Sequence, residues 1–252
     1  MRLRRCLMGF ALSRSVLIIL HQETSSPGRV GYVLRGMGYS LDIRRPPLGD
    51  ILPERLEEFS GVIVFGGPMS ANDNDEWLLG ELRLIERAMY QRVPYLGLCL
   101  GAQMLCRVLD ARVYRHPAEQ VEIGYYPVWP TETGLNLAHE LEVAWPSHVY
   151  HWHREGFDLP RHATALAEGP TFPLQAFMYQ QSSFGLQFHP EVTYAMMNRW
   201  TVRAYDRMQH PGAREPHDHL TGWYQYDHAV ANWLRPFLKY WLRQDNRNLP
   251  QG

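Results

Sequence analysis

Cysteine is scarce in this sequence, since only three of its 252 residues are cysteines. Cys6, Cys99 and Cys106 are too few and too irregularly spaced for a disulfide framework or a cysteine-based zinc site. Their odd number favours free thiols, which fit a reducing, cytoplasmic setting.

Charge of one sign and long apolar runs are also missing. The 25 basic and 26 acidic residues leave a formal net charge of -1, so no global field draws the protein to nucleic acid or to an anionic membrane. No stretch approaches the roughly 18 to 20 apolar residues that span a bilayer. We therefore expect no nucleic-acid partner and no membrane association. The apolar content of 45% is nevertheless ample for a substantial core.

The start of the chain contains a short pattern that imitates a secretory signal. Three arginines precede the apolar run of residues 6–12, but Arg14 interrupts that run. The next apolar run, residues 16–20, is better explained as the first buried strand of the fold. The sequence therefore favours residues 1–14 as an N-terminal extension and residues 15–252 as a single domain.

The first half of this domain alternates short, β-branched apolar runs with longer helical patterns. Such alternation is typical of a parallel sheet that is wrapped by helices. Ser26 is expected to cap the first helix, with Pro27 in its first turn and Gly38 at its end. The pattern predicts strands at residues 16–20, 39–43, 62–65 and 95–98, and helices at residues 26–38, 53–59, 76–90 and 101–109.

The second half is less regular. A proline- and glycine-containing loop near residues 211–216 separates two expected helices, and His217 and His219 are expected to be solvated there. No linker is long or biased enough to require a second domain, and no internal repeat is visible. Strands are predicted at residues 121–128, 148–152, 174–179 and 184–188, and extra C-terminal helices from about residue 195, near 194–208 and 224–242.

The strongest chemical signal is Cys99, which lies between a predicted strand and a predicted helix and is flanked by Gly97 and Gly101. Glycines on both sides allow a tight turn that exposes a nucleophile to substrate. The dipole of the following helix lowers the pKa of a thiol, and the N–H of Leu100 can face a developing oxyanion. From this motif alone, a buried structural cysteine is an equally good interpretation.

A second signal comes from His189 and Glu191, which follow a predicted strand. Residues two apart on an extended segment project to the same side, so the carboxylate can orient the imidazole. A surface turn would explain this pair if it stood alone, but together with Cys99 the pair predicts a catalytic triad.

The third signal is the loop that begins with Gly66 and Gly67, which follows a buried strand at the edge where α/β proteins place ligands. Paired glycines let the backbone approach a substrate closely. The loop matches neither common phosphate-binding glycine motif, and no cofactor is expected. His148, His151 and His153 invite a metal interpretation, but His148 points away from the other two on a strand, so no metal is predicted.

With these motifs the chain resembles the class I, triad-type glutamine amidotransferase family. The resemblance rests on GGPMS at 66–70, GLCLGAQ at 97–103 and QFHPE at 187–191, and it covers roughly residues 15–195. The segment at 150–160 is similar to the WHGDTFDLP stretch of stand-alone members that resemble the amidotransferase domain of GMP synthase. Arg154 and Glu155 replace the usual Gly-Asp, a departure that bears on acceptor or partner contacts and not on the triad.

The resemblance implies an α/β fold of the flavodoxin-like, doubly wound and mostly parallel type, with helices on both faces. It also implies a nucleophile at Cys99, a base at His189 and an orienting carboxylate at Glu191. These implied site residues are completed by an oxyanion hole from the N–H groups of Gly67 and Leu100, and by substrate contacts at Gly66 and Gln103.

The expected reaction is hydrolysis of the γ-carboxamide of glutamine through a cysteine thioester, which gives glutamate and ammonia. No acceptor-activating domain is apparent, so a separate synthetase partner is expected to use the ammonia. The alternative is a stand-alone γ-glutamyl hydrolase or peptidase that acts on another γ-glutamyl amide. A third class, a binding or regulatory protein on the same scaffold, is disfavoured because all three triad residues are present.

Overall fold

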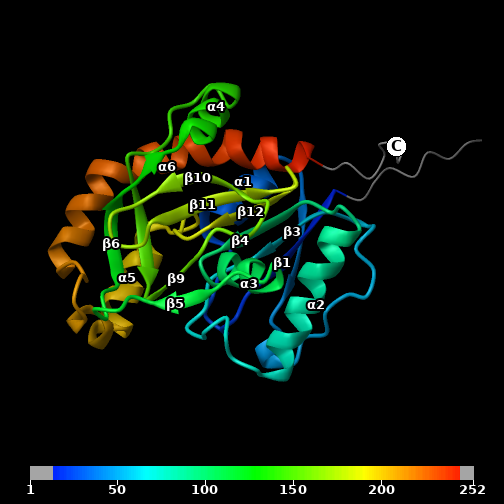
Figure 1. Cartoon of the computed structure of the whole chain (residues 1–252), viewed down its shortest axis with the longest axis horizontal. Coiled ribbons are helices and arrows are strands. Elements are labelled where there is room, and N and C mark those ends of the chain that lie inside the picture. The colour runs from blue at the N-terminus through cyan, green and yellow to red at the C-terminus, as the bar shows by residue number, and fades with distance from the viewer. Residues whose placement is uncertain (1–13, 245–252) are drawn as a thin grey trace, which may run out of the picture.

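An eight-stranded sheet forms the centre of the computed structural model, which describes residues 14–244 (Figure 1). Five neighbouring strands run parallel in the order β2-β1-β3-β4-β12, and the strands β11, β10 and β7 extend one edge in antiparallel fashion. This order confirms the predicted doubly wound, mostly parallel α/β fold. The strands are β1 (Ser15–Ile19), β2 (Ser40–Arg44), β3 (Phe59–Val64), β4 (Tyr95–Leu98), β7 (Trp129–Pro130), β10 (Thr164–Glu168), β11 (Leu174–Tyr179) and β12 (Ser183–Leu186).

Helices cover both faces of the sheet, because the central strands are apolar on both sides. In Figure 1, α1 (Gly28–Gly36) and the long α6 (Pro216–Arg243) lie above the sheet, and α2 (Glu76–Tyr90) and α3 (Leu100–Val108) lie below it. Alternate residues of β1 belong to two separate cores: Ile18 shares one core with Trp233 of α6, whereas Leu17 shares the other with Leu78 of α2. Each face of the sheet therefore has its own hydrophobic core.

The C-terminal region differs from the sequence prediction in where its helices begin and end. The predicted helix at 194–208 is divided at Ala204, whose backbone is not helical, into α5 (Tyr194–Arg203) and the 3-10 helix η2 (Tyr205–Gln209). The last helix begins at Pro216 rather than near residue 224, because a proline is well accommodated in the first turn. His219 is consequently helical and buried, with its Nδ1 2.9 Å from the hydroxyl of Tyr150, so the expectation that it is solvated was wrong.

The predicted helix at 53–59 was also wrong. This segment consists of turns and extended backbone that leads into β3, while a short 3-10 helix, η1 (Pro46–Leu48), forms just before it. Seven residues are too few to offset the cost of starting an α-helix. Only Leu56 and Phe59 of the segment are buried, and they need no helix to reach the core.

Short elements that the sequence did not predict complete the second half. They are α4 (Glu132–Glu140), β7, β10, and a small antiparallel pair of β5 (Val113–Arg115) with β9 (Glu155–Phe157). Another antiparallel pair, β6 (Glu122–Pro127) with β8 (His148–His153), lies outside the main sheet.

Two further findings concern regions discussed from the sequence. The predicted N-terminal extension lies almost entirely outside the described residues. Within residues 14–244, no helix combines the length and the apolar character needed to cross a membrane.

Candidate active site

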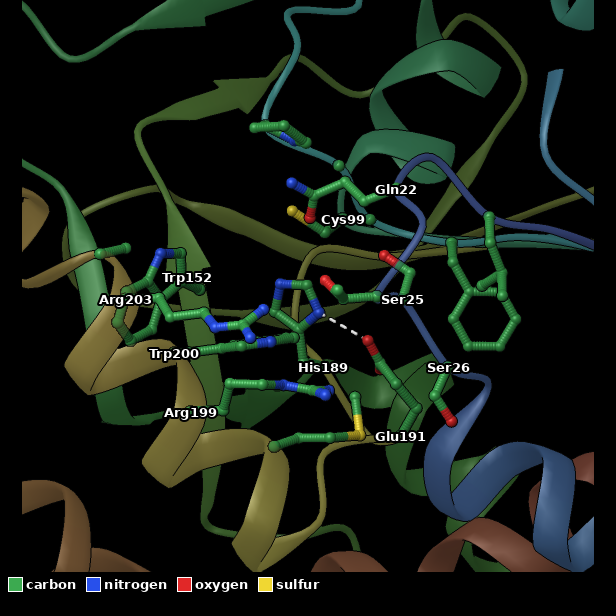
Figure 2. A pocket seen from close by; sticks show the side chains of 18 of the residues that line it. Gln22, Ser25, Ser26, Cys99, Trp152, His189, Glu191, Arg199, Trp200 and Arg203 are labelled. Carbon is green, nitrogen blue, oxygen red and sulfur yellow. Dashed lines mark hydrogen bonds and ion pairs between the residues drawn. The ribbon is translucent and has the colours of Figure 1, made fainter. Parts of the chain in front are cut away.

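The predicted site residues meet at one edge of the sheet. Gly66 and Cys99 follow the carboxyl ends of the parallel strands β3 and β4, and His189 follows the neighbouring strand β12. This is the edge at which doubly wound sheets hold their ligands. A cleft of about 420 Å³ opens there, bordered by Gly66, Cys99 and His189 together with residues of α5 and η2 (Figure 2).

Cys99 occupies a strained turn between β4 and α3. Its φ of 51° and ψ of -103° lie in a region that non-glycine residues rarely adopt. The neighbouring glycines allow the turn to be this tight, since a Cβ on Gly97 would come within 2.4 Å of the backbone of Gly101. Leu100 begins α3, so its N–H has no acceptor within the helix. The turn thus holds a nearly buried thiol beside a backbone N–H that has no acceptor within its own helix.

His189 and Glu191 form the contact that the sequence predicted. Nδ1 of His189 is 2.8 Å from Oε1 of Glu191, and both residues are buried. Nε2 of His189 has no hydrogen-bond partner within the described chain. Gly66 lies against both the imidazole and Cys99, since a Cβ on this glycine would lie 2.8 Å from Cε1 of His189 and 3.5 Å from Cβ of Cys99. The structure therefore brings all three residues of the predicted triad together.

The electrostatics of the site favour a protonated His189. Burial lowers the pKa of this histidine, but the nearby charges of Glu191 and Cys99 and the hydrogen bond with Glu191 raise it by more, to about 10. The carboxylate of Glu191 and the side chain of Cys99 therefore stabilise the imidazolium between them. This arrangement can deliver a proton to a leaving group close to the thiol.

A buried pair that the sequence analysis missed fixes the Gly66–Gly67 loop. Nδ1 of His21 donates to the carbonyl oxygen of Gly66 over 3.0 Å, and Nε2 of His21 is 3.0 Å from Oε2 of Glu81. Both side chains are buried. The available signals were a histidine directly after a predicted strand and a glutamate on the core side of α2. Neither signal shows that His21 and Glu81 contact each other or that His21 binds the Gly66 carbonyl.

Gln103, which the sequence analysis expected to contact substrate, is buried and hydrogen-bonded within the protein. Its Nε2 donates to the carbonyl oxygen of Glu155 over 2.8 Å, and its side chain is buried. Gln103 and Cys99 both border a second cleft of about 280 Å³, which also includes His153. Gln103 therefore lies beside the nucleophile but is already engaged with the backbone of β9.

The wall of the main cleft contains cationic and aromatic residues that the sequence analysis did not single out. Arg199 and Arg203 reach from α5 toward His189 (Figure 2), and Arg207 of η2 also borders the cleft. Within the described chain, none of the three arginines forms an ion pair with a carboxylate. The ring of Trp200 meets His189 edge-on at a centroid distance of 5.1 Å. The wall formed by α5 and η2 thus carries three arginines, with the carboxylate of Asp206 beside them.

A second polar cluster lies on the β6–β8 pair. Nε2 of His153 is 3.0 Å from Oε2 of Glu122 and 3.1 Å from Nδ1 of His151. Burial raises the pKa of Glu122, but the two histidines and a hydrogen bond from Gln175 lower it by more, so that it falls to about 2. Burial lowers the pKa of His151 to about 3. Within residues 14–244, these three residues are the only group of histidine, cysteine or acidic side chains arranged to hold a metal ion.

Comparison with known proteins identifies the family. The sequence model of the glutamine amidotransferase class-I family matches residues 32–202, which include all three sequence motifs. The chain belongs to the class-I glutamine amidotransferase family.

Individual relatives agree with this assignment. The chain is similar to the glutamine amidotransferase-like protein YfeJ of Salmonella typhimurium, with 33% identity over 71% of this chain and 76% of that protein. It is 29% identical to a glutamine-hydrolysing GMP synthase subunit from Pyrococcus abyssi over 77% of this chain and 98% of that protein. The crystal structure of a glutamine amidotransferase from Thermotoga maritima has a TM-score of 0.80 and 33% identity, covering 90% of this chain and 97% of that one. The longer GMP synthases also match, but this chain covers only 27% to 31% of their length.

Proposed function

We propose that this protein hydrolyses the γ-carboxamide of glutamine to glutamate and ammonia through a thioester on Cys99. The observation that carries the proposal is the placement of Cys99, in a strained turn, beside the hydrogen-bonded pair of His189 and Glu191. Family membership supports the same chemistry.

The proposed reaction begins with attack of the Cys99 thiolate on the amide carbon, while His189 is protonated. The negative charge that develops on the amide oxygen is stabilised by the N–H groups of Gly67 and Leu100. Nε2 of His189 then protonates the departing nitrogen, so that the C–N bond breaks and ammonia leaves. Because Glu191 holds Nδ1, the free Nε2 is the nitrogen that carries the transferred proton.

The second half of the reaction removes the acyl group. Neutral His189 takes a proton from water, and the resulting hydroxide attacks the thioester carbon. Cleavage of the C–S bond releases glutamate and restores the thiolate beside an imidazolium. Each oxyanion donor is expected to contribute about 3 to 4 kcal/mol to lowering the barrier.

The test compares the two buried thiols of the described chain. Cys99→Ala should abolish release of ammonia from glutamine, while circular dichroism shows a folded protein. Cys106→Ala is the matched control, since Cys106 lies in the core of α3 away from the cleft, and it should keep most of the activity. Full activity in Cys99→Ala would refute the assignment.

We further propose that the ammonia is used by a separate synthetase partner. The support is similarity to a protein named as one subunit of a glutamine-hydrolysing GMP synthase, of which this chain covers 98%. The test is to measure glutamine turnover by the purified chain with and without proteins that co-purify from its native cell. A rise in turnover that depends on one partner is expected, and vigorous turnover in its absence would count against the proposal.

A second candidate function, γ-glutamyl hydrolase or peptidase, is favoured by the arginines of the cleft. A γ-glutamyl peptide carries a carboxylate beyond the scissile bond that glutamine lacks. Arg199, Arg203 and Arg207 could bind it, because guanidinium groups form strong paired hydrogen bonds with carboxylates. Faster cleavage of γ-glutamyl dipeptides than of glutamine, without any partner, would establish this function instead.

A further inference from the structure

We propose that Glu122, His151 and His153 bind a divalent transition-metal ion, with Zn²⁺ as the best match to their donor set. The sequence alone predicted no metal, because His148 points away from the other two histidines. His148 indeed stacks on Tyr226 on the other side of β8. The third donor comes instead from Glu122 on the neighbouring strand β6.

The strand register places the three donors. Glu122 is directly opposite His153 in the antiparallel pair, and His151 is two residues away from His153, so all three project from the same face. The donor atoms are separated by 3.0 Å, 3.1 Å and 3.6 Å. Donors about 2.1 Å from a tetrahedral zinc ion lie about 3.4 Å apart, so the observed spacing fits such an ion closely.

The hydrogen bonding of His153 determines which of its ring nitrogens faces the other two donors. Nδ1 of His153 is 3.0 Å from the carbonyl oxygen of Glu155, which only accepts, so Nδ1 carries the hydrogen. Nε2 of His153 is therefore the ring nitrogen that faces Oε2 of Glu122 and Nδ1 of His151. A single metal ion among these three atoms would contact all of them at once.

The surroundings have the form of a metal site. The contact from His153 to the carbonyl of Glu155 orients its ring in the manner common for metal-bound histidines. Gln175 donates to Oε2 of Glu122 over 2.9 Å, while Oε1 of Glu122 is buried without a partner in the described chain. His153 borders the second cleft, which gives an ion a route from solvent.

The expected role of the ion is to hold the β6–β8 pair in place. This pair lies outside the main sheet, and two strands alone are only marginally stable. The pair adjoins the site, because the backbone N–H of His189 donates to the carbonyl oxygen of Tyr150 on β8 over 2.8 Å. The ion would thus support the backbone that positions His189.

The experiment measures zinc binding in the full chain carrying Cys99→Ala, which removes the thiolate of the active site as a competing ligand. After removal of metal with a chelator, Zn²⁺ is titrated in competition with a chromogenic chelator, and the thermal unfolding temperature is followed. We expect about one equivalent to bind and to raise that temperature by mass action. Glu122→Gln and His151→Gln, each in the same background, should weaken binding by about 100-fold or more.

His148→Gln is the matched control, because it removes a histidine from the same strand outside the cluster, and it should bind zinc as the parent does. Co²⁺ gives a readout that does not depend on the variants folding. Its visible spectrum in the Cys99→Ala protein should show four-coordinate bands without a sulfur charge-transfer band. Failure of that protein to bind Zn²⁺, equal binding by Glu122→Gln, or a sulfur-ligated Co²⁺ spectrum would each overturn the proposal.

Discussion

His21 donates a hydrogen bond from Nδ1 to the carbonyl oxygen of Gly66 over 3.0 Å. The N–H of Gly67 belongs to the same peptide group, and in a trans peptide it points opposite to that carbonyl. The hydrogen bond therefore fixes the direction of the donor that we assign to the oxyanion hole. Glu81, 3.0 Å from the other ring nitrogen, holds His21 in turn.

This relationship predicts a positioning role for His21. His21→Leu should lower kcat for glutamine by about 10- to 100-fold with little change in KM, because a misdirected oxyanion donor weakens mainly the transition state. His21→Asn should recover part of the loss, since its side-chain N–H can reach the place of Nδ1. Steady-state kinetics on both variants provides the measurement, with thermal unfolding as a check on folding. Equal losses in kcat for Leu and Asn would contradict the idea.

The effect of Glu191 should depend on pH. The pKa of His189 is raised from about 6.5 to about 10, so its charge interactions stabilise the fold fully below about pH 6.5 and are lost as pH rises through 10. Glu191→Gln removes the hydrogen-bonded negative charge. We expect this substitution to cost more stability at pH 7 than at pH 10, by about 1 kcal/mol or more. Urea unfolding of both proteins at the two pH values measures the difference, and an equal cost at both would rule out this account.

Two glycine substitutions should have opposite effects. A Cβ on Gly101 would lie 2.1 Å from the carbonyl oxygen of Val64, so Gly101→Ala must push α3 away from β3 and should cost more than about 2 kcal/mol. A Cβ on Gly80, within α2, would meet nothing closer than 3.8 Å. Gly80→Ala should therefore stabilise the protein by about 0.5 to 1 kcal/mol. Denaturant unfolding tests both predictions. An unchanged free energy of unfolding in Gly101→Ala would contradict the close approach of α3 to β3.

The arginines of the cleft allow the two candidate functions to be separated. If γ-glutamyl peptides are substrates, Arg199→Gln and Arg203→Gln should raise KM for a γ-glutamyl dipeptide by about 10-fold and change KM for glutamine much less. Arg35→Gln, on the exposed side of α1, is the matched control. Equal effects on both substrates would assign the arginines to glutamine itself or to the protein surface.

Much of the parallel half of the fold could be predicted from the sequence, because its strands are buried on both faces and therefore appear as continuous apolar runs. The limits of β4 and α2 were predicted as observed, since a long, periodic helix and a run that ends at a glycine-flanked cysteine are strong local signals. The two- and three-residue strands β5, β7 and β9 carry no local pattern, because their pairing depends on distant partners.

The same distinction applies to the site. Cys99, His189 and Glu191 are recognisable because each lies in a short motif whose neighbours restrict the backbone. His21 was missed because its partners are 45 and 60 residues away along the chain, and no local pattern records such contacts. Glu122 was missed for a similar reason, since only the register of β6 with β8 places it opposite His153.

The position of β12 has a consequence for the order in which the protein folds and becomes active. This strand inserts between β4 and β11, and it brings His189 next to a thiol ninety residues earlier in the chain. Closing so long a loop is slow, because its entropy must be lost before the contact forms. The first four parallel strands could assemble with Cys99 already in its turn and still be inert. Recovery of the proposed glutaminase activity during refolding should therefore lag behind recovery of helical structure, so a newly made chain would gain that activity only once its sheet is complete.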